Sequence, residues 1–256
     1  MYLMPMEFCS VQLMLLQFSF WKLAFSTSPE IVTKTVLYCD AHKECYTIGR
    51  SKGLIGYMLG EGLQKEMKKG LSNGPVWINL HILLQKTGSN AKKKWIYGEK
   101  VTTSDGITIK EEKERRHEEG DRIAVLTAKG MHRRVIGATS KYRFACDFRP
   151  DSRRDLIIHR EEFLRDASRK TNELFALSSS TAGCFHHVFN STSIACGMTC
   201  YLNAVCRSFY HNFKENLCIH SLYVDSLLTM FDWRVKPEGW KRFWRPKWSL
   251  SKDGAK

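Results

Sequence analysis

Four closely spaced cysteines near the C-terminal end carry the clearest chemistry in this chain: Cys196, Cys200, Cys206 and Cys218. The i, i+4 spacing of Cys196 and Cys200 puts both thiols on one face of a helical turn. Structural zinc sites usually show two close C-x(2–4)-C or H-x(3–5)-H pairs. Even with the nearby His211 and His220, only the first two cysteines approach that spacing. The pattern therefore favours disulfides over a zinc site.

Motifs of enzymatic catalysis are missing from the sequence. It contains no G-x-S-x-G, no phosphate-binding P-loop and no H-E-x-x-H. The adjacent pair His186-His187 favours a strand or turn rather than a metal site, because neighbouring strand residues point to opposite faces. We therefore expect a protein that is not an enzyme and needs no metal or other cofactor.

The charge of the chain favours anionic partners. Its 256 residues contain 40 Lys and Arg against 26 Asp and Glu, a net charge of +14. Such a surplus suits glycosaminoglycans, anionic lipid surfaces, microbial envelopes or nucleic acid, although it also serves solubility. Two clusters place cations beside aromatic rings. The cations can bind sulfate or phosphate, and the rings can stack on sugars. The candidate polyanion-binding residues are Lys92, Lys93, Lys94, Lys241, Arg242, Arg245 and Lys247. The alternative is a solvated tail with its tryptophans in the core.

The N-terminal segment predicts secretion. Residues 1–28 contain a mostly apolar run from Val11 to Phe25, which we interpret as a signal peptide cleaved between about Ala24 and Pro29. A buried N-terminal helix or an uncleaved anchor are the alternatives. Removal of the segment would take Cys9 with it and leave eight cysteines, an even number. The sequon Asn190-Ser191-Thr192 predicts a glycan on Asn190, which also requires the secretory route.

The remainder divides into two units of an α+β protein. Residues 29–149 contain one helical stretch and several short apolar runs typical of strands, among them 75–80, 94–97, 123–126 and 142–146. Residues 150–171 are strongly charged and predict a linker. Residues 172–248 form a second unit, which is small enough to need disulfide staples, and 249–256 are a tail.

The second unit resembles the PAN/apple domain family. The resemblance rests on the helical C-G-x-x-C of 196–200, the C-R-S-F of 206–209, a cysteine twelve positions later, and the segment 238–243 (EGWKRF) as a closing strand. It implies the pairs Cys196–Cys218 and Cys200–Cys206, which would fasten a helix to a small antiparallel sheet. It also implies a binding module for proteins or carbohydrates.

The first unit resembles a C-type lectin-like domain. Residues 41–45 (AHKEC) match the family's first helix, 76–80 (VWINL) its W-I-G-L strand, and 142–146 (YRFAC) its last strand. The resemblance implies a Cys45–Cys146 disulfide between that helix and that strand. The family's second disulfide would join positions near Arg122 and Ala138, and neither position is a cysteine here.

The calcium ligands of that family are also replaced. Glu118, Glu119 and Asp121 could supply oxygens, but His132-Arg133-Arg134 stands where further anionic ligands would be needed. We therefore expect binding without calcium. Cys39 and Cys184 remain unassigned: they could bond to each other across the units, bridge two molecules, or stay free.

Together these features predict a secreted glycoprotein that recognises extracellular carbohydrate or protein, in adhesion or innate defence. It would not span a membrane once the signal peptide is removed, and no nucleic acid is expected as a partner. The alternative is a basic extracellular protein that binds glycosaminoglycans or other polyanions and uses the lectin-like domain only as a scaffold. Salt separates the two, because polyanion binding weakens steeply with ionic strength.

Overall fold

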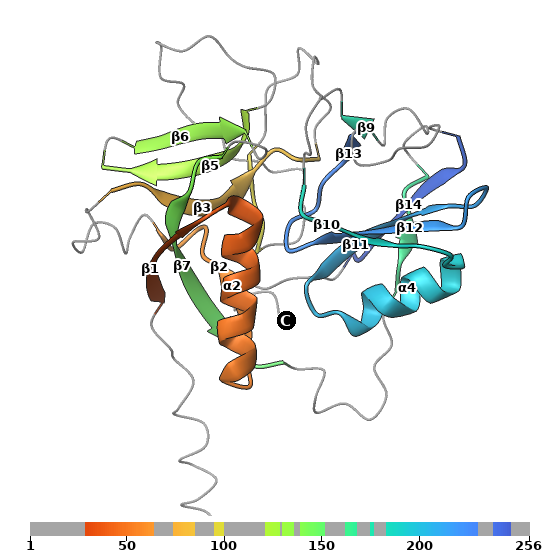
Figure 1. Ribbon diagram of the computed structural model, residues 1–256, viewed down its shortest axis with the longest axis horizontal. Coiled ribbons are helices and arrows are strands. Elements are labelled where there is room, and N and C mark those ends of the chain that lie inside the picture. Colours follow the sequence, from red (N-terminus) through yellow and green to blue (C-terminus); the bar gives the residue numbers. More distant parts are fainter. Residues whose placement is uncertain are drawn as a thin grey trace, which may run out of the picture.

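The computed structural model places two β-sheets side by side, each accompanied by one helix (Figure 1). The structure describes residues 29–63, 74–84, 95–99, 121–128, 130–135, 139–151, 162–167, 175–176, 183–229 and 238–246. The predicted signal peptide, the predicted tail, and the cations Lys92, Lys93, Lys94 and Lys247 lie outside the described residues. The predicted α+β class is confirmed.

The first sheet has seven strands in the order β1-β7-β3-β5-β6, with β2 also paired to β7 and β4 to β3. The strands are β1 (Glu30–Val36), β2 (Ile55–Met58), β3 (Val76–His81), β4 (Ile96–Tyr97), β5 (Asp121–Thr127), β6 (Gly130–Val135) and β7 (Tyr142–Arg149). The β3–β7 pair is parallel and the other pairs are antiparallel. All six residues of β3 are buried, as expected for a central strand with both faces covered.

Helix α2 (Tyr38–Ser51) packs against this sheet through one face. The buried residues recur at the helical period: Tyr38, Ala41, His42, Cys45 and Gly49. A Cβ on Gly49 would lie 2.1 Å from the backbone nitrogen of Gly56. Only glycine therefore allows α2 to approach β2 this closely, and the Cys45–Cys146 disulfide joins the helix to β7.

Apolar side chains cover both faces of the first sheet. One cluster lies between the sheet and α2 and includes Trp77, Val125 and Phe144. A second cluster on the opposite face includes Ile78, Leu80 and Trp95. The indole N–H of Trp77 donates to the carbonyl oxygen of Val36 at 2.8 Å, so this buried ring also ties β3 to the end of β1.

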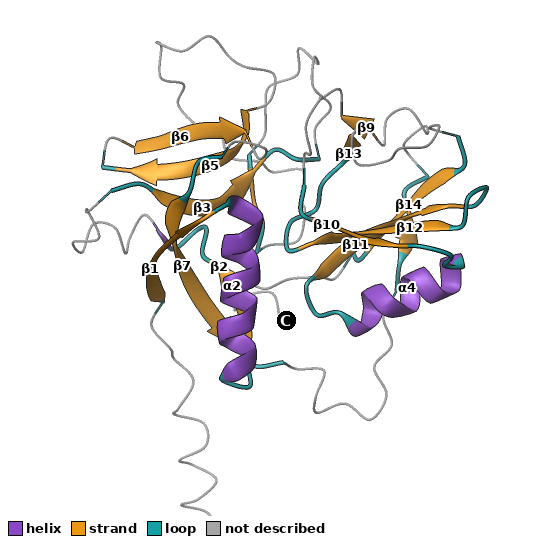
Figure 2. Cartoon of the chain, in the orientation of Figure 1, coloured by secondary structure: helices purple, strands orange, loops and turns teal. Residues whose placement is uncertain are grey.

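The second sheet is antiparallel and has the order β10-β12-β11-β14-β8. Its strands are β8 (Leu164–Arg165), β10 (Phe185–Val188), β11 (Cys206–Asn212), β12 (Leu217–Leu222) and β14 (Trp240–Trp244). Helix α4 (Ser193–Leu202) lies across one face, where it contacts β11 and β12 (Figure 2). A short parallel pair, β9 (Phe175–Ala176) and β13 (Leu228–Thr229), completes the unit.

Strand β8 corrects the predicted boundary between the units. It lies inside the segment 150–171 that the charge pattern predicts to be a linker, yet Leu164 pairs with Trp244 and Arg165 with Phe243. The ring of Phe163 packs against Phe209 in a T-shaped arrangement with centroids 5.2 Å apart. A few apolar residues inside a charged run are therefore enough to add an edge strand to the second sheet.

The two units share parts of their cores. Cys39 of α2 is bonded to Cys184 of the second unit, which resolves the open assignment of these two cysteines. Cys184 and Val224 belong to the same buried cluster as Trp77. Another mixed cluster joins Leu84 to Leu227. The units therefore form one packed body.

Candidate recognition surface

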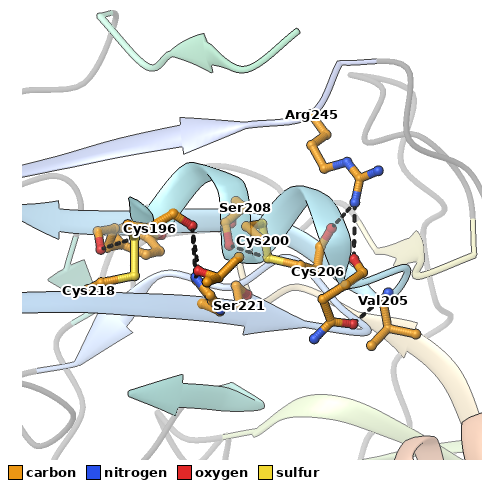
Figure 3. The surroundings of a disulfide bond; sticks show 12 residues. Cys196, Cys200, Val205, Cys206, Ser208, Cys218, Ser221 and Arg245 are labelled. Atoms are coloured by element: carbon orange, nitrogen blue, oxygen red, sulfur yellow. Dashed lines mark hydrogen bonds between the residues drawn. A yellow bond between two sulfur atoms is a disulfide. The ribbon is translucent and has the colours of Figure 1, made fainter. Parts of the chain in front are cut away.

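Helix α4 is held against its sheet by two disulfides (Figure 3). Cys196 is bonded to Cys218 of β12, and Cys200 to Cys206 at the start of β11. Both predicted pairs, and the predicted Cys45–Cys146 pair, are confirmed. The two helical sulfurs lie on the same side of α4, as their i, i+4 spacing requires. This fixes which face of the helix turns outward.

The outward face of α4 is apolar. Ile194, Met198 and Leu202 recur at every fourth position and are 79%, 53% and 71% exposed. We call these three residues the α4 apolar face. The helix, SIACGMTCYL, contains no charged residue at all. Such a continuous apolar stripe is informative on a surface, because isolated exposed apolar residues are common but contiguous ones mark sites that something covers.

The predicted glycosylation sequon forms the turn that leads into α4. Asn190 is exposed and adopts φ 51°, a left-handed conformation that asparagine tolerates. Ser191 is buried: its N–H donates to the carbonyl oxygen of Asn216 at 2.9 Å, and its own carbonyl oxygen lies 2.7 Å from Nε2 of His211. The side chain of Thr192 caps the helix by accepting the N–H of Ala195 at 3.2 Å.

The structure removes two residues from the predicted polyanion-binding cluster. Arg242 is only 5% exposed, and its guanidinium donates to Asp166 at 2.9 Å and to Asp225. Burial alone would raise the pKa of Asp225, but the charges of Arg242 and Arg207 outweigh it and lower that pKa. Arg242 therefore neutralises buried carboxylates instead of facing a ligand.

Arg245 has a structural task as well. It is 6% exposed and donates to the backbone carbonyls of Cys206 at 2.8 Å and Asn203 at 3.3 Å, just beyond the end of α4 (Figure 3). Lys241 is half-buried, and its ammonium lies 4.3 Å from the centroid of the Phe213 ring. In strand β14 alternate side chains face opposite sides of the sheet, so Lys241 and Phe243 share one face while Arg242 and Trp244 share the other.

Strand β6 brings a different set of cations to an edge. It lies at one edge of the first sheet, and among the described residues it pairs only with β5. It carries His132, Arg133 and Arg134, the residues expected to disfavour calcium. Arg134 donates through Nε to the hydroxyl of Tyr142 at 3.2 Å, and Arg133 lies over the Trp95 ring at 5.8 Å. Glu118 and Glu119 lie outside the described residues.

The zinc alternative does not fit the sulfur chemistry. Potential ligand atoms of Cys196, Cys218 and His220 lie within 4.8 Å of one another. Metal binding requires thiolates, however, and these two sulfurs are bonded to each other at 2.03 Å. Nε2 of His220 already lies 3.1 Å from the carbonyl oxygen of Cys196 and 3.2 Å from the Thr199 hydroxyl. The cluster is therefore a disulfide with a supporting histidine.

Buried titratable groups gather where the units meet. Arg207 of β11 donates to the carbonyl oxygen of Gly98 in the first unit at 2.7 Å. Burial lowers the pKa of Arg207 to about 10, and burial together with the Arg207 charge lowers the pKa of His42 and of His81 to about 3. Burial also raises the pKa of Glu99 to about 7 against three backbone N–H groups that stabilise its charged form. At neutral pH the two imidazoles are therefore uncharged.

Arg122 occupies one position where the lectin-like resemblance expects a cysteine. It is 3% exposed and donates through Nη2 to the carbonyl oxygens of Leu83 at 2.8 Å and Ile82 at 3.2 Å. The carbonyl oxygen of Leu83 also accepts the N–H of Leu227 from the second unit, at 2.9 Å. A buried arginine thus organises the loop at the junction, in place of a covalent bond.

The α4 apolar face escapes a search for motifs because it has no reactive group. One signal in the sequence could reveal it: residues 194, 198 and 202 are large and apolar, while the cysteines at 196 and 200 must face the sheet. Because the face with the two cysteines packs on the sheet, the face with residues 194, 198 and 202 must point away from it.

Comparisons with known proteins add little. No family model matches the chain, and no curated protein matches it. Among solved structures, one described as "Structure of EPNH mutant of CEL-I" matches with 14% sequence identity and a TM-score of 0.33, covering 47% of this chain and 89% of that chain. A similarity at this TM-score establishes neither a shared fold nor a shared ligand. Among the described residues, no helix combines the length and apolarity needed to cross a bilayer.

Proposed function

We propose that this protein is a secreted, non-enzymatic recognition protein that binds extracellular carbohydrate or protein ligands without calcium. In this proposal residues 29–149 are a degenerate C-type lectin-like domain and the second unit is a PAN/apple domain. Adhesion and innate defence are the settings in which such binding would act.

One observation carries the proposal: all eight cysteines from Cys39 to Cys218 are paired in four disulfides, and every one of these cysteines except the half-buried Cys39 is buried. Disulfides persist in oxidising compartments and are rare in the cytosol. Their positions also agree with the two resemblances, since one joins the first helix to the last strand of the first sheet and two fasten α4 to its sheet. A protein so stapled can offer a fixed surface to a ligand outside the cell.

Non-reducing mass spectrometry tests the oxidised state. The protein is produced in a eukaryotic secretory host, treated with an alkylating reagent without reduction, and digested. We expect the four disulfide-linked peptide pairs and no alkylation at the eight paired cysteines. Full alkylation of these cysteines would contradict the proposal and point to a reducing compartment.

A glycan array tests the ligand class and the calcium expectation. The secreted protein is applied to the array with and without a chelator of divalent cations. We expect the same set of bound glycans in both conditions, because β6 presents His132, Arg133 and Arg134 in place of anionic metal ligands. Loss of binding with the chelator would contradict calcium-independent recognition. An empty array would direct the search to protein ligands.

Polyanion binding is the second candidate, and the edge position of β6 favours it. Arg133 and Arg134 stand on an edge strand beside the half-buried His132. Replacement of both arginines by alanine should then lower the salt concentration that elutes the protein from heparin, with Lys241→Ala as a single-charge comparison. Elution that is unchanged by the double replacement would exclude β6 as the polyanion site. Arg242 and Arg245 are not part of this candidate, because both are buried.

A further inference from the structure

We infer that an N-linked glycan on Asn190 covers the apolar face of α4, so that the mature protein shows a sugar surface where the polypeptide alone is apolar. This inference rests on the proposed secretory route, since the glycan is attached there. The inference assigns a structural role to the glycan, which becomes a fixed part of the surface of the second unit.

The sequon forms a fixed turn that presents Asn190 to the solvent. The middle residue, Ser191, is 6% exposed and held by its two backbone contacts to Asn216 and His211. A middle residue that is anchored in this way fixes the turn, and both Asn190 and Thr192 are exposed. The acceptor asparagine is therefore presented outward at the N-terminal end of α4.

The acceptor asparagine lies close to the α4 apolar face. Asn190 lies two residues before the N-cap Thr192, and its neighbour Phe189 is 71% exposed. Ile194 follows in the first turn of α4, and Leu202 lies eight residues further along, roughly 12 Å at 1.5 Å per residue. A branched glycan is bulky and solubilising. Its sugar rings can lay their C–H faces on apolar side chains and keep their hydroxyls in water, so it suits an uncharged helix face.

Other occupants fit the α4 apolar face less well than the glycan. Three side chains expose too little area for a stable dimer, which needs about 800 Å² from each partner. A second copy of the chain would therefore not be held by the α4 apolar face alone. A protein ligand would have to approach past the group attached at Asn190. The sequon makes the glycan the occupant that the chain itself supplies.

The test compares four forms of the full-length secreted protein. Peptide N-glycosidase removes the glycan from the folded protein and leaves aspartate at the site, so Asn190→Asp has the same polypeptide as the enzyme product. Aspartate also tolerates a positive φ, which protects the turn. Thr192→Ser keeps both the sequon and the helix cap and serves as the matched control. A fourth form adds Ile194→Gln, Met198→Gln and Leu202→Gln to Asn190→Asp.

Three readouts are used: intact mass for the glycan, light scattering for the monomer fraction, and fluorescence of an apolar dye. We expect the untreated protein and Thr192→Ser to be glycosylated, monomeric and low in dye fluorescence. The glycosidase product and Asn190→Asp should self-associate and bind several-fold more dye. The fourth form should return both readings to those of the untreated protein.

Two outcomes overturn the inference while the proposed function stands. One is a secreted, disulfide-bonded protein whose Asn190 carries no glycan. The other is a glycosylated protein whose dye binding does not change when the glycan is removed, which would leave the face free for a protein or a membrane. Reactive thiols in the purified protein would instead overturn the proposed function itself.

Discussion

At the scale of single residues, the arginines of the C-terminal segment show how burial decides the role of a charge. Arg242 contacts both Asp166 and Asp225, and Ser208 donates to Asp225 at 2.6 Å. A side chain that the sequence offers as a polyanion ligand is thereby committed inside the protein. The contribution of this buried network is measurable because removing one member leaves buried charges with less compensation.

Asp225→Ala should therefore lower the free energy of unfolding strongly, by about 3–5 kcal/mol, because it removes the buried carboxylate that offsets the charge of Arg207 and leaves Arg242 paired with Asp166. Urea unfolding followed by tryptophan fluorescence measures the change. The matched control is Lys214→Ala, which removes the exposed ion pair of Lys214 with Glu238 (2.8 Å) and should cost no more than about 1 kcal/mol. Equal effects of the two substitutions would contradict the importance assigned to burial.

The buried groups at the junction predict how stability depends on pH. His42 and His81 have pKa values near 3 in the folded protein and 6.5 when unfolded, so each removes stability as the pH falls below 6.5. The pKa of Glu99 is raised from 4.5 to about 7, so its protonation adds stability as the pH falls from 7 to 4.5. Between pH 6.5 and 4.5 the unfolded state therefore binds one proton more than the folded state at these three groups. The free energy of unfolding should fall by about 1.4 kcal/mol for each pH unit that the pH falls in this range.

Two single substitutions check this balance in opposite directions. His42→Phe keeps a ring against Tyr223, on which His42 stacks with centroids 5.4 Å apart. The substitution should lower the slope of the unfolding free energy against pH, below pH 6.5, by the amount that corresponds to about one bound proton. Glu99→Gln should raise the same slope, between pH 4.5 and 7, by the amount that corresponds to about one bound proton. Urea unfolding across pH 4–8 gives both slopes, and shifts of the same sign in the two variants would disprove the assignment.

At the scale of elements, α4 depends on its staples more than on its own sequence. It has only ten residues, too few for a stable isolated helix, and no other part of the described polypeptide buries its outward face. Its order comes from the cap at Thr192 and the bonds of Cys196 and Cys200. The disulfides therefore decide whether the apolar face of α4 has a fixed shape.

The two staples should contribute unequally. Cys196–Cys218 closes a loop of sequence separation 22, and Cys200–Cys206 one of separation 6. In the chain-entropy description the longer loop stabilises by about 3 kcal/mol and the shorter by about 1 kcal/mol less. Replacing each pair by serines and measuring urea unfolding should give that order. A larger loss from the Cys200–Cys206 pair would show that helix anchoring at Cys200, and not loop closure, dominates.

The elements also show where sequence reasoning succeeds and where it fails. The spacing of Cys196 and Cys200 predicts α4 correctly, and the apolar runs around Trp77 and Phe144 predict β3 and β7, because burial leaves a strong pattern. Strand β8 is missed, since two residues inside a charged run carry no pattern. The burial of Arg242 is missed for a different reason: its partners Asp166 and Asp225 are 76 and 17 residues away in sequence.

At the scale of the whole molecule, the two units are predicted to unfold together. A linker joining separate modules would allow each to unfold alone. Here the junction contains a disulfide, shared apolar packing and hydrogen bonds between the units. Cys39–Cys184 joins the units covalently, Arg207 reaches the carbonyl oxygen of Gly98, and the N–H of Leu227 donates to the carbonyl oxygen of Leu83. The core of the first unit includes residues of the second, because Val224 belongs to the cluster around Trp77 and Ala204 packs with Ile55 and Tyr57.

Leu227→Ala tests this coupling. Leu227 is fully buried against Leu84 of the first unit, so its truncation should cost about 2–5 kcal/mol. Because the junction belongs to both units, the single transition should move to lower urea without splitting, whether followed by near-UV circular dichroism or by tryptophan fluorescence. The matched control is Leu202→Ala on the exposed face of α4, which should change stability by no more than about 0.5 kcal/mol. Two separated transitions in either the parent or the Leu227 variant would mean that the units fold independently and that the disulfide alone holds them together.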